Sequence, residues 1–153
     1  MPLHKDVVLY IDSDACPVKE DAVRAARRHG IAVVLVGNQW IRSLEGAHIR
    51  QVVVPVEPDA ADHWIAAEIG NGDICITNDI PLAARCVEAG ATALSPSGRI
   101  LDAASAGMAL AVRDLMTNLR DSGEITGGPR PYSSRDRQAF LNALERLLVR
   151  GKT

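Results

Sequence analysis

Short apolar runs rich in β-branched residues alternate along this chain with helical segments of about ten residues. The runs span residues 7–11, 31–36, 51–56, 73–77 and 91–94. Strands that alternate with helices predict βαβ units and a mostly parallel sheet, and right-handed crossovers place helices on both of its faces. A sheet covered on both faces explains why these runs are continuously apolar. We therefore predict a three-layer α/β/α fold whose central sheet has about five strands.

Proline, glycine and capping residues predict where the helices begin and end. The first helix runs from about Pro17 to His29, a second from Asp59 to Ile69, and a third from Ile80 to Ala89. Pro55 places its strand at a sheet edge or strand end. Two further helices are expected in a C-terminal extension over about 99–150, one over 100–120 and one beginning at Ser133 or Ser134 with Asp136 in a capping box. The whole chain, 1–153, is expected to form one domain.

Composition narrows the class of protein further. The net charge of -2 gives no overall basic signature of nucleic-acid binding, although a local patch remains open. Three cysteines without CxxC spacing favour a reducing compartment. Cys16 lies near a helix N-terminus, which could lower its pKa, but a packing role is expected. With neither a signal-peptide pattern nor a long apolar stretch, the sequence predicts a soluble cytoplasmic protein without a membrane span.

Aspartates follow the strands at the points where they end. Asp12 and Asp14 come directly after the first strand, Asp79 follows the fourth, and Asp59 and Asp62 lie where a helix begins. The carboxyl ends of parallel strands form one edge of a sheet, where ligands bind in this class of fold. Carboxylates that converge there suit Mg²⁺ or Mn²⁺. We predict Asp12, Asp14, Asp62 and Asp79 as metal ligands, with Asp12 and Asp79 catalytic, and assign Asp59 to helix capping.

A glycine-rich loop between the last two helices is a candidate phosphate-binding element. Gly127 and Gly128 would let the backbone approach a phosphate closely. Arg130, Arg135 and Arg137 flank the loop, and arginine suits bidentate phosphate contacts. A simple turn between two packed helices is the competing interpretation.

Several motifs resemble those of the YaiI/YqxD-like bacterial proteins, an uncharacterised family. They are Asp12-Ser13-Asp14-Ala15-Cys16-Pro17-Val18-Lys19, Asp59-Ala60-Ala61-Asp62, Thr77-Asn78-Asp79-Ile80-Pro81-Leu82-Ala83, Arg113-Asp114, Thr126-Gly127-Gly128-Pro129 and Arg135-Asp136-Arg137-Gln138-Ala139-Phe140. The family is similar in fold to PIN domains, commonly metal-dependent ribonucleases. The resemblance implies a PIN-like fold, with Asp12 and Asp79 as metal ligands and Asp62 near the middle one. Lys19, the cation of the first motif, joins the candidate phosphate contacts. Leu94-Ser95-Pro96-Ser97-Gly98 departs from an L-N-P-R-G pattern, which puts substrate contacts there in question.

Three functions remain open at this point. The first is a Mg²⁺- or Mn²⁺-dependent ribonuclease with RNA as its partner. The second is a phosphatase of the haloacid-dehalogenase type, with Asp12 as nucleophile and Asp14 as general acid, although lysine is scarce in this chain. The third is a non-catalytic module that binds metal or nucleic acid. The Ala-rich helix expected over 100–120 offers a face for a homodimer, but nothing in the sequence requires one.

Overall fold

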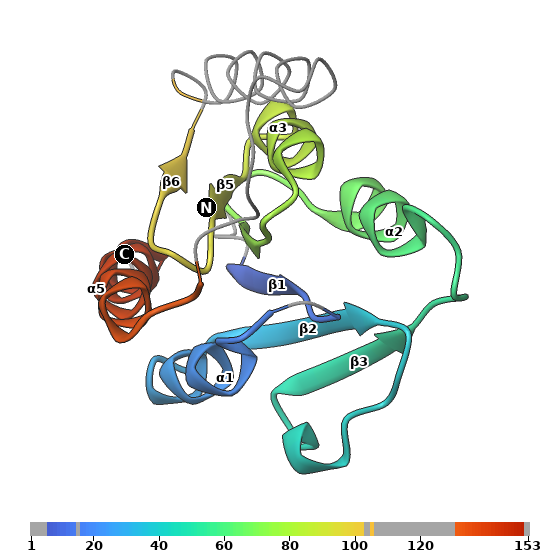
Figure 1. Ribbon diagram of the computed structural model, residues 1–153, viewed down its shortest axis with the longest axis horizontal. Coiled ribbons are helices and arrows are strands. Elements are labelled where there is room, and N and C mark those ends of the chain that lie inside the picture. Colours follow the sequence, from blue (N-terminus) through green and yellow to red (C-terminus); the bar gives the residue numbers. More distant parts are fainter. Residues whose placement is uncertain (1–5, 15, 103–104, 106–130, 152–153) are drawn as a thin grey trace, which may run out of the picture.

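The protein is built around one six-stranded sheet with the strand order β3-β2-β1-β4-β5-β6 (Figure 1). The computed structural model describes residues 6–14, 16–102, 105 and 131–151. Five strands run parallel, and β6 pairs antiparallel to β5. In chain order the strands are β1 (Val8–Asp12), β2 (Ala32–Gly37), β3 (Ile49–Val53), β4 (Ile74–Ile76), β5 (Thr92–Leu94) and β6 (Ile100–Leu101). The mostly parallel α/β architecture predicted from the sequence is confirmed.

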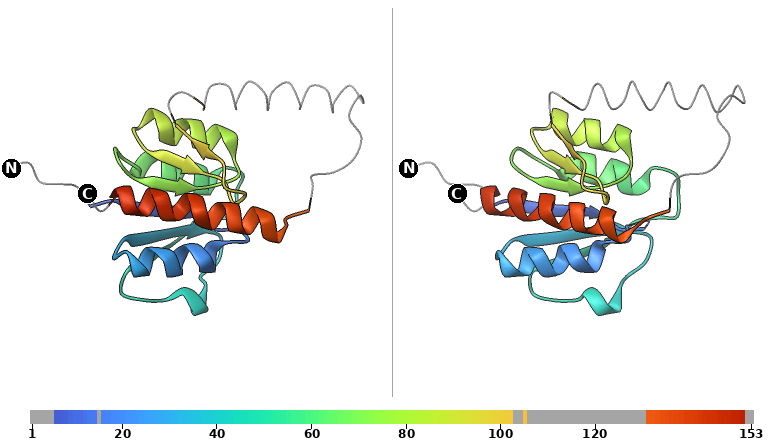
Figure 2. Two further views of the ribbon diagram at one scale, coloured as in Figure 1. Left: turned by 90° about the vertical axis from the view of Figure 1, so that its left-hand side faces the viewer. Right: turned by 60° about the vertical axis from the view of Figure 1, so that its left-hand side comes forward.

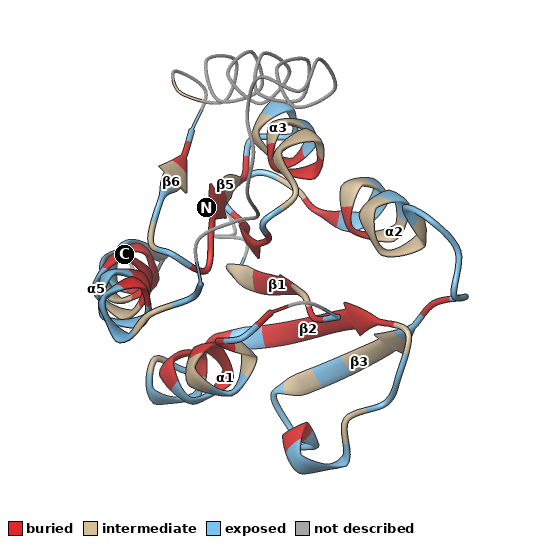
Figure 3. Cartoon of the chain, in the orientation of Figure 1, coloured by how far each residue is buried: buried red, intermediate tan, exposed pale blue. Residues whose placement is uncertain are grey.

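Helices cover both faces of this sheet, as the continuous apolar runs indicate. Helix α1 (Lys19–Arg28) and the long helix α5 (Ser134–Gly151) lie side by side on one face (Figure 2). Helices α2 (Ala60–Glu68) and α3 (Ile80–Glu88) pack on the other face. Alternate residues of β1 supply the two cores, with Leu9 and Ile11 on the α1 side and Tyr10 on the α2 side. Figure 3 shows buried residues concentrated in the sheet and on the inward faces of these helices.

The predicted helix boundaries are largely confirmed. Gly30 follows α1 with a φ of 68°, the left-handed conformation that glycine adopts without steric cost. Asp79 caps α3, because its carboxylate accepts a hydrogen bond from Leu82 N at 2.9 Å. At the start of α5, Ser133 N donates to Asp136 Oδ2 at 3.0 Å and Asp136 N donates to Ser133 Oγ at 3.2 Å. This reciprocal pair is the capping box expected from the sequence.

Two sequence predictions are wrong and need correction. Ile100–Leu101 forms strand β6, not the start of a helix, because it can pair with β5 at Ala93 and Leu94 after a tight turn at Gly98. The sheet therefore has six strands instead of about five, and the rest of the helix predicted over 100–120 lies outside the described residues except 102 and 105. Asp59 occupies the N-cap position of α2, but its side chain makes no capping hydrogen bond.

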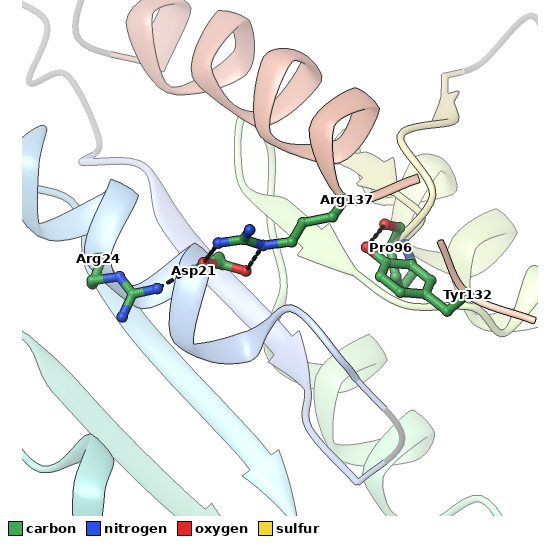
Figure 4. A network of polar contacts seen from close by, with 5 residues as sticks. All are labelled: Asp21, Arg24, Pro96, Tyr132 and Arg137. Atoms are coloured by element: carbon green, nitrogen blue, oxygen red, sulfur yellow. Dashed lines mark hydrogen bonds and ion pairs between the residues drawn. The ribbon is translucent and has the colours of Figure 1, made fainter. Parts of the chain in front are cut away.

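Helix α5 is anchored through its first turn to the same end of the sheet at which β1 and β5 finish. Arg137 donates to both carboxylate oxygens of Asp21 at 2.9 Å, and Arg24 donates to Asp21 as well (Figure 4). Tyr132 Oη donates to Pro96 O at 2.7 Å, directly beyond β5. These contacts seat α5 beside α1, on the face opposite α2 and α3. Within the described residues, no helix combines the length and the apolar character needed to cross a bilayer.

Candidate metal centre

Thr77 links the two aspartates that follow the central strands β1 and β4. The Thr77 hydroxyl donates to Asp12 Oδ2 at 3.0 Å. Its oxygen, Oγ1, accepts from the backbone N–H of Asp79 at 3.0 Å. Ile11 pairs with Ile76 across the sheet, so Asp12 and Thr77 come directly after paired residues. The parallel register therefore brings Asp12 and Asp79 together across 67 residues of chain, as the sequence predicts.

Three carboxylates converge beside this link. Asp59, Asp62 and Asp79 each offer an oxygen, and these oxygens all lie within 4.8 Å of one another. Asp62 comes from the first turn of α2 and Asp79 from the N-cap of α3. Asp59 reaches the group from a left-handed backbone conformation with a φ of 65°, the only positive φ among the described non-glycine residues. A strained backbone conformation that serves no capping bond is typical of a functional position.

The electrostatics of the cluster favour a bound cation. Partial burial, reinforced by the charges of Asp79 and Asp12, raises the pKa of Asp62 to about 7. Burial also raises the pKa of Asp12, opposed by the Thr77 hydrogen bond and reinforced by the charges of Asp79 and Asp14. Carboxylates this close repel one another when ionised. A divalent cation would remove that repulsion, and an all-oxygen donor set suits Mg²⁺ or Mn²⁺.

Asp14 binds the backbone at the end of the neighbouring strand β2. The side chain is exposed, and both of its oxygens accept from the backbone N–H of Asn38, at 2.9 and 3.1 Å. Asn38 Nδ2 in turn donates to Pro55 O at 3.2 Å. This close approach requires glycine at position 37, since a Cβ there would lie 2.6 Å from Asp14 Oδ1. Asp14 thus joins the ends of β1, β2 and β3, while its assignment as a metal ligand remains a prediction.

The described cationic candidates Lys19 and Arg137 make their hydrogen bonds away from the aspartates of the cluster. Lys19 Nζ donates to Ser13 O at 3.4 Å and so braces the loop between β1 and α1. Arg137 is held by Asp21, so a phosphate would have to compete with that carboxylate. Arg135 is exposed on the first turn of α5. Gly127, Gly128 and Arg130 lie outside the described residues, so their predicted role in binding phosphate stays a prediction.

The turn that departs from the family pattern is closed by its own serines. Ser95 Oγ accepts from Arg99 N at 3.0 Å and lies 3.0 Å from Ser97 Oγ. Gly98 then packs against Ala139 of α5 so closely that a Cβ would lie 2.6 Å from the Ala139 backbone carbon. These residues shape the junction of β5, β6 and α5.

Cys16 does not supply a reactive thiol. Burial raises its pKa to about 11, which outweighs any effect of the helix N-terminus. Cys16 belongs to the core between the sheet and α1, in agreement with the packing role expected from the sequence.

Sequence reasoning missed two residues of the centre. Asp59 was assigned to capping because aspartate is common at N-caps, and only the left-handed backbone reveals that its carboxylate turns to Asp62 and Asp79. Thr77 carried a usable signal, because a hydroxyl residue at the end of a buried strand next to Asp79 is well placed to bridge strand ends.

The fold and the acidic edge together define a mostly parallel α/β protein with a candidate divalent-metal centre at the carboxyl ends of its strands. Residues 10–150 match the family described as "Uncharacterized BCR, YaiI/YqxD family", and the chain belongs to that family. A UPF0178 protein of Azorhizobium caulinodans is 50% identical over 146 residues, which cover 95% of this chain and 92% of the relative. A UPF0178 protein of Rhodopseudomonas palustris strain TIE-1 is 53% identical over 142 residues, 93% and 90% of the two chains. No solved structure matches this chain.

Proposed function

We propose that this protein is a Mg²⁺- or Mn²⁺-dependent nuclease that hydrolyses phosphodiester bonds in RNA. The observation that carries the proposal is the convergence of Asp59, Asp62 and Asp79 beside Asp12 at the carboxyl edge of a parallel sheet. The resemblance of the family motifs to PIN-like ribonucleases supports the choice of substrate by analogy.

Each residue of the centre has a distinct task in this proposal. Asp59, Asp62 and Asp79 hold the metal through carboxylate oxygens. Asp12 extends the negative charge of the site, and the Thr77 hydroxyl fixes its orientation. The metal, when bound, supplies an activated water and stabilises charge on the phosphodiester. Asp14 is a positioning residue in this proposal, because both of its oxygens hold the backbone N–H of Asn38.

The phosphatase alternative fits this geometry less well. A general acid at Asp14 would need a protonated oxygen that faces the substrate. Both Asp14 oxygens instead accept from one backbone N–H, that of Asn38. Lys19 Nζ is already engaged by Ser13 O, and lysine is otherwise scarce in this chain.

Metal-dependent RNA cleavage by matched variants tests the proposal. Asp79→Asn is informative because asparagine caps a helix as well as aspartate does, so α3 should keep its start. We expect Asp79→Asn and Asp62→Asn to lower Mn²⁺-dependent cleavage of a labelled RNA pool at least about 100-fold. Glu88→Gln, which removes an exposed carboxylate at the end of α3, should cleave like the wild type.

Calorimetry with Mn²⁺ separates the remaining outcomes. Metal binding by the wild type that is lost in Asp79→Asn, without cleavage of any RNA, would support the non-catalytic module instead. Absence of both metal binding and cleavage would overturn the proposal, as would full activity in Asp79→Asn.

A further inference from the structure

Two tryptophans occupy very different environments in this protein. Trp64, on α2, is half-buried, with the guanidinium of Arg50 5.4 Å from its ring centre and the ring of Tyr10 at 6.4 Å. Trp40 is 57% exposed on the segment that connects β2 to β3. Trp64 therefore contributes to packing, whereas the contacts of Trp40 leave most of its ring open to solvent.

Hydrogen bonds fix the Trp40 ring and the residues before and after it in the chain. Trp40 Nε1 donates to Glu45 Oε1 at 2.9 Å. Two residues earlier, Asn38 is held by Asp14 and Pro55. One residue later, the Gln51 side chain accepts from Ile41 N at 2.7 Å and donates to Ile41 O at 2.8 Å. An aromatic ring held this firmly needs little further ordering when a ligand binds to it.

The segment that carries Trp40 begins at the same end of the sheet as the acidic cluster. Asp12 pairs in register with Val36 of β2, and Trp40 follows four residues after Val36. Figure 1 shows the segment after β2 passing the end of β3, the strand that leads to α2 and Asp59. Val53, the last residue of β3, and Val56, three residues later, are 52% and 84% exposed, so this end of β3 also presents apolar side chains to solvent.

We propose that Trp40 stacks against a nucleobase of single-stranded nucleic acid and so positions the strand across the carboxyl edge of the sheet. This inference rests on the proposed nuclease function. Exposed aromatic rings bind unpaired bases of any sequence through their π-faces. Arg42 is exposed two residues beyond Trp40 and supplies a cation for the neighbouring phosphate. A protein partner would explain the exposed valines but not this pairing of ring and cation on a segment that begins at the carboxyl edge of the sheet.

Trp40 fluorescence in the Trp64→Phe variant provides a direct test, because Trp40 is then the sole tryptophan. We expect a ten-nucleotide single-stranded RNA to quench this fluorescence to saturation, and an abasic strand of equal length to leave it nearly unchanged. A DNA strand of matching sequence shows whether the ring distinguishes the sugar, and gel analysis after each titration shows that the strand is intact. Absence of quenching by every strand, or equal quenching by the abasic strand, would overturn the inference.

Substitutions at Trp40 give a second readout by strand binding in anisotropy. Trp40→Ala should weaken binding of the RNA strand about 5- to 100-fold, the range that one stacked base contributes, whereas Trp40→Phe should retain most of the affinity. Equal affinity of Trp40→Ala and the wild type would contradict the inference.

Failure of this inference and failure of the proposed function are distinguishable. Quenching by RNA without cleavage by the wild type would retain the base-binding role and remove the nuclease. Metal-dependent cleavage whose KM is unchanged in Trp40→Ala would retain the nuclease and remove the role of Trp40.

Discussion

Two aspartates at opposite ends of β4 show how differently this protein uses a carboxylate. Asp73, just before the strand, is buried, and its oxygens accept from Val8 N at 3.1 Å and Gly70 N at 2.9 Å. Asp79, just beyond the strand, shares its surroundings with Asp59 and Asp62 within 4.8 Å. Backbone donors satisfy the charge of Asp73, whereas the charges near Asp79 oppose one another. The comparison indicates that the first carboxylate stabilises the fold, whereas the second belongs to the candidate metal centre.

The strongest challenge to this comparison is removal of the Asp73 side chain. Asp73→Ala leaves two partly buried backbone N–H groups without this acceptor, so we expect it to lower the free energy of unfolding by about 2–4 kcal/mol. Asp73→Asn keeps an acceptor oxygen and should cost less. Urea denaturation measures both values. If Asp73→Ala weakened Mn²⁺ binding by the folded protein, the proposed division between the two ends of β4 would be incorrect.

Replacement of Asp62 is expected to raise the stability of the protein at neutral and alkaline pH, the opposite of the effect of replacing Asp73. Its pKa rises from the ordinary 3.8 to about 7 in the folded protein, so the folded state holds this proton more tightly than the unfolded chain does. The resulting stability is full below pH 3.8 and is lost as the pH rises toward 7. Because Asp62 is only partly buried, solvent screening keeps the effect modest.

Thermal unfolding without metal tests this prediction. Asp62→Asn should raise Tm by about 2–5 °C at pH 8 and change it little at pH 4. Mn²⁺ should stabilise the wild type at pH 8 more than the variant, because it binds the native carboxylates. A lower Tm for Asp62→Asn at pH 8 would show that Asp62 acts as a structural acceptor like Asp73.

The smallest change in stability is expected for replacement of Asp14. The Asp14 variants also test whether this residue is a ligand of the metal centre. Asp14→Ala removes the acceptor for Asn38 N and should cost about 1 kcal/mol of stability. Asp14→Asn retains an acceptor oxygen without the negative charge, and should keep both stability and metal affinity. Mn²⁺ calorimetry on the two variants decides the role, since a metal ligand would lose affinity in Asp14→Asn as well.

Local sequence patterns were sufficient for much of the architecture. The apolar runs at 7–11 and 31–36 correspond to β1 and β2, and Gly30 and Ser133 mark helix ends as predicted. The pattern was insufficient at Ile100–Leu101, because a two-residue strand exists only through its pairing with β5. Such a pairing depends on a neighbour and leaves no period in the sequence.

The amino-acid sequence alone determined that aspartates would follow the ends of parallel strands, because the parallel direction of the strands follows from the alternation of apolar runs and helices. Only the tertiary structure decided which of them meet. The left-handed backbone at Asp59 turns one carboxylate into the cluster, and the Asp14 carboxylate accepts from the backbone N–H of Asn38. Both outcomes depend on packing between segments far apart in the chain, which residue preferences at single positions do not encode.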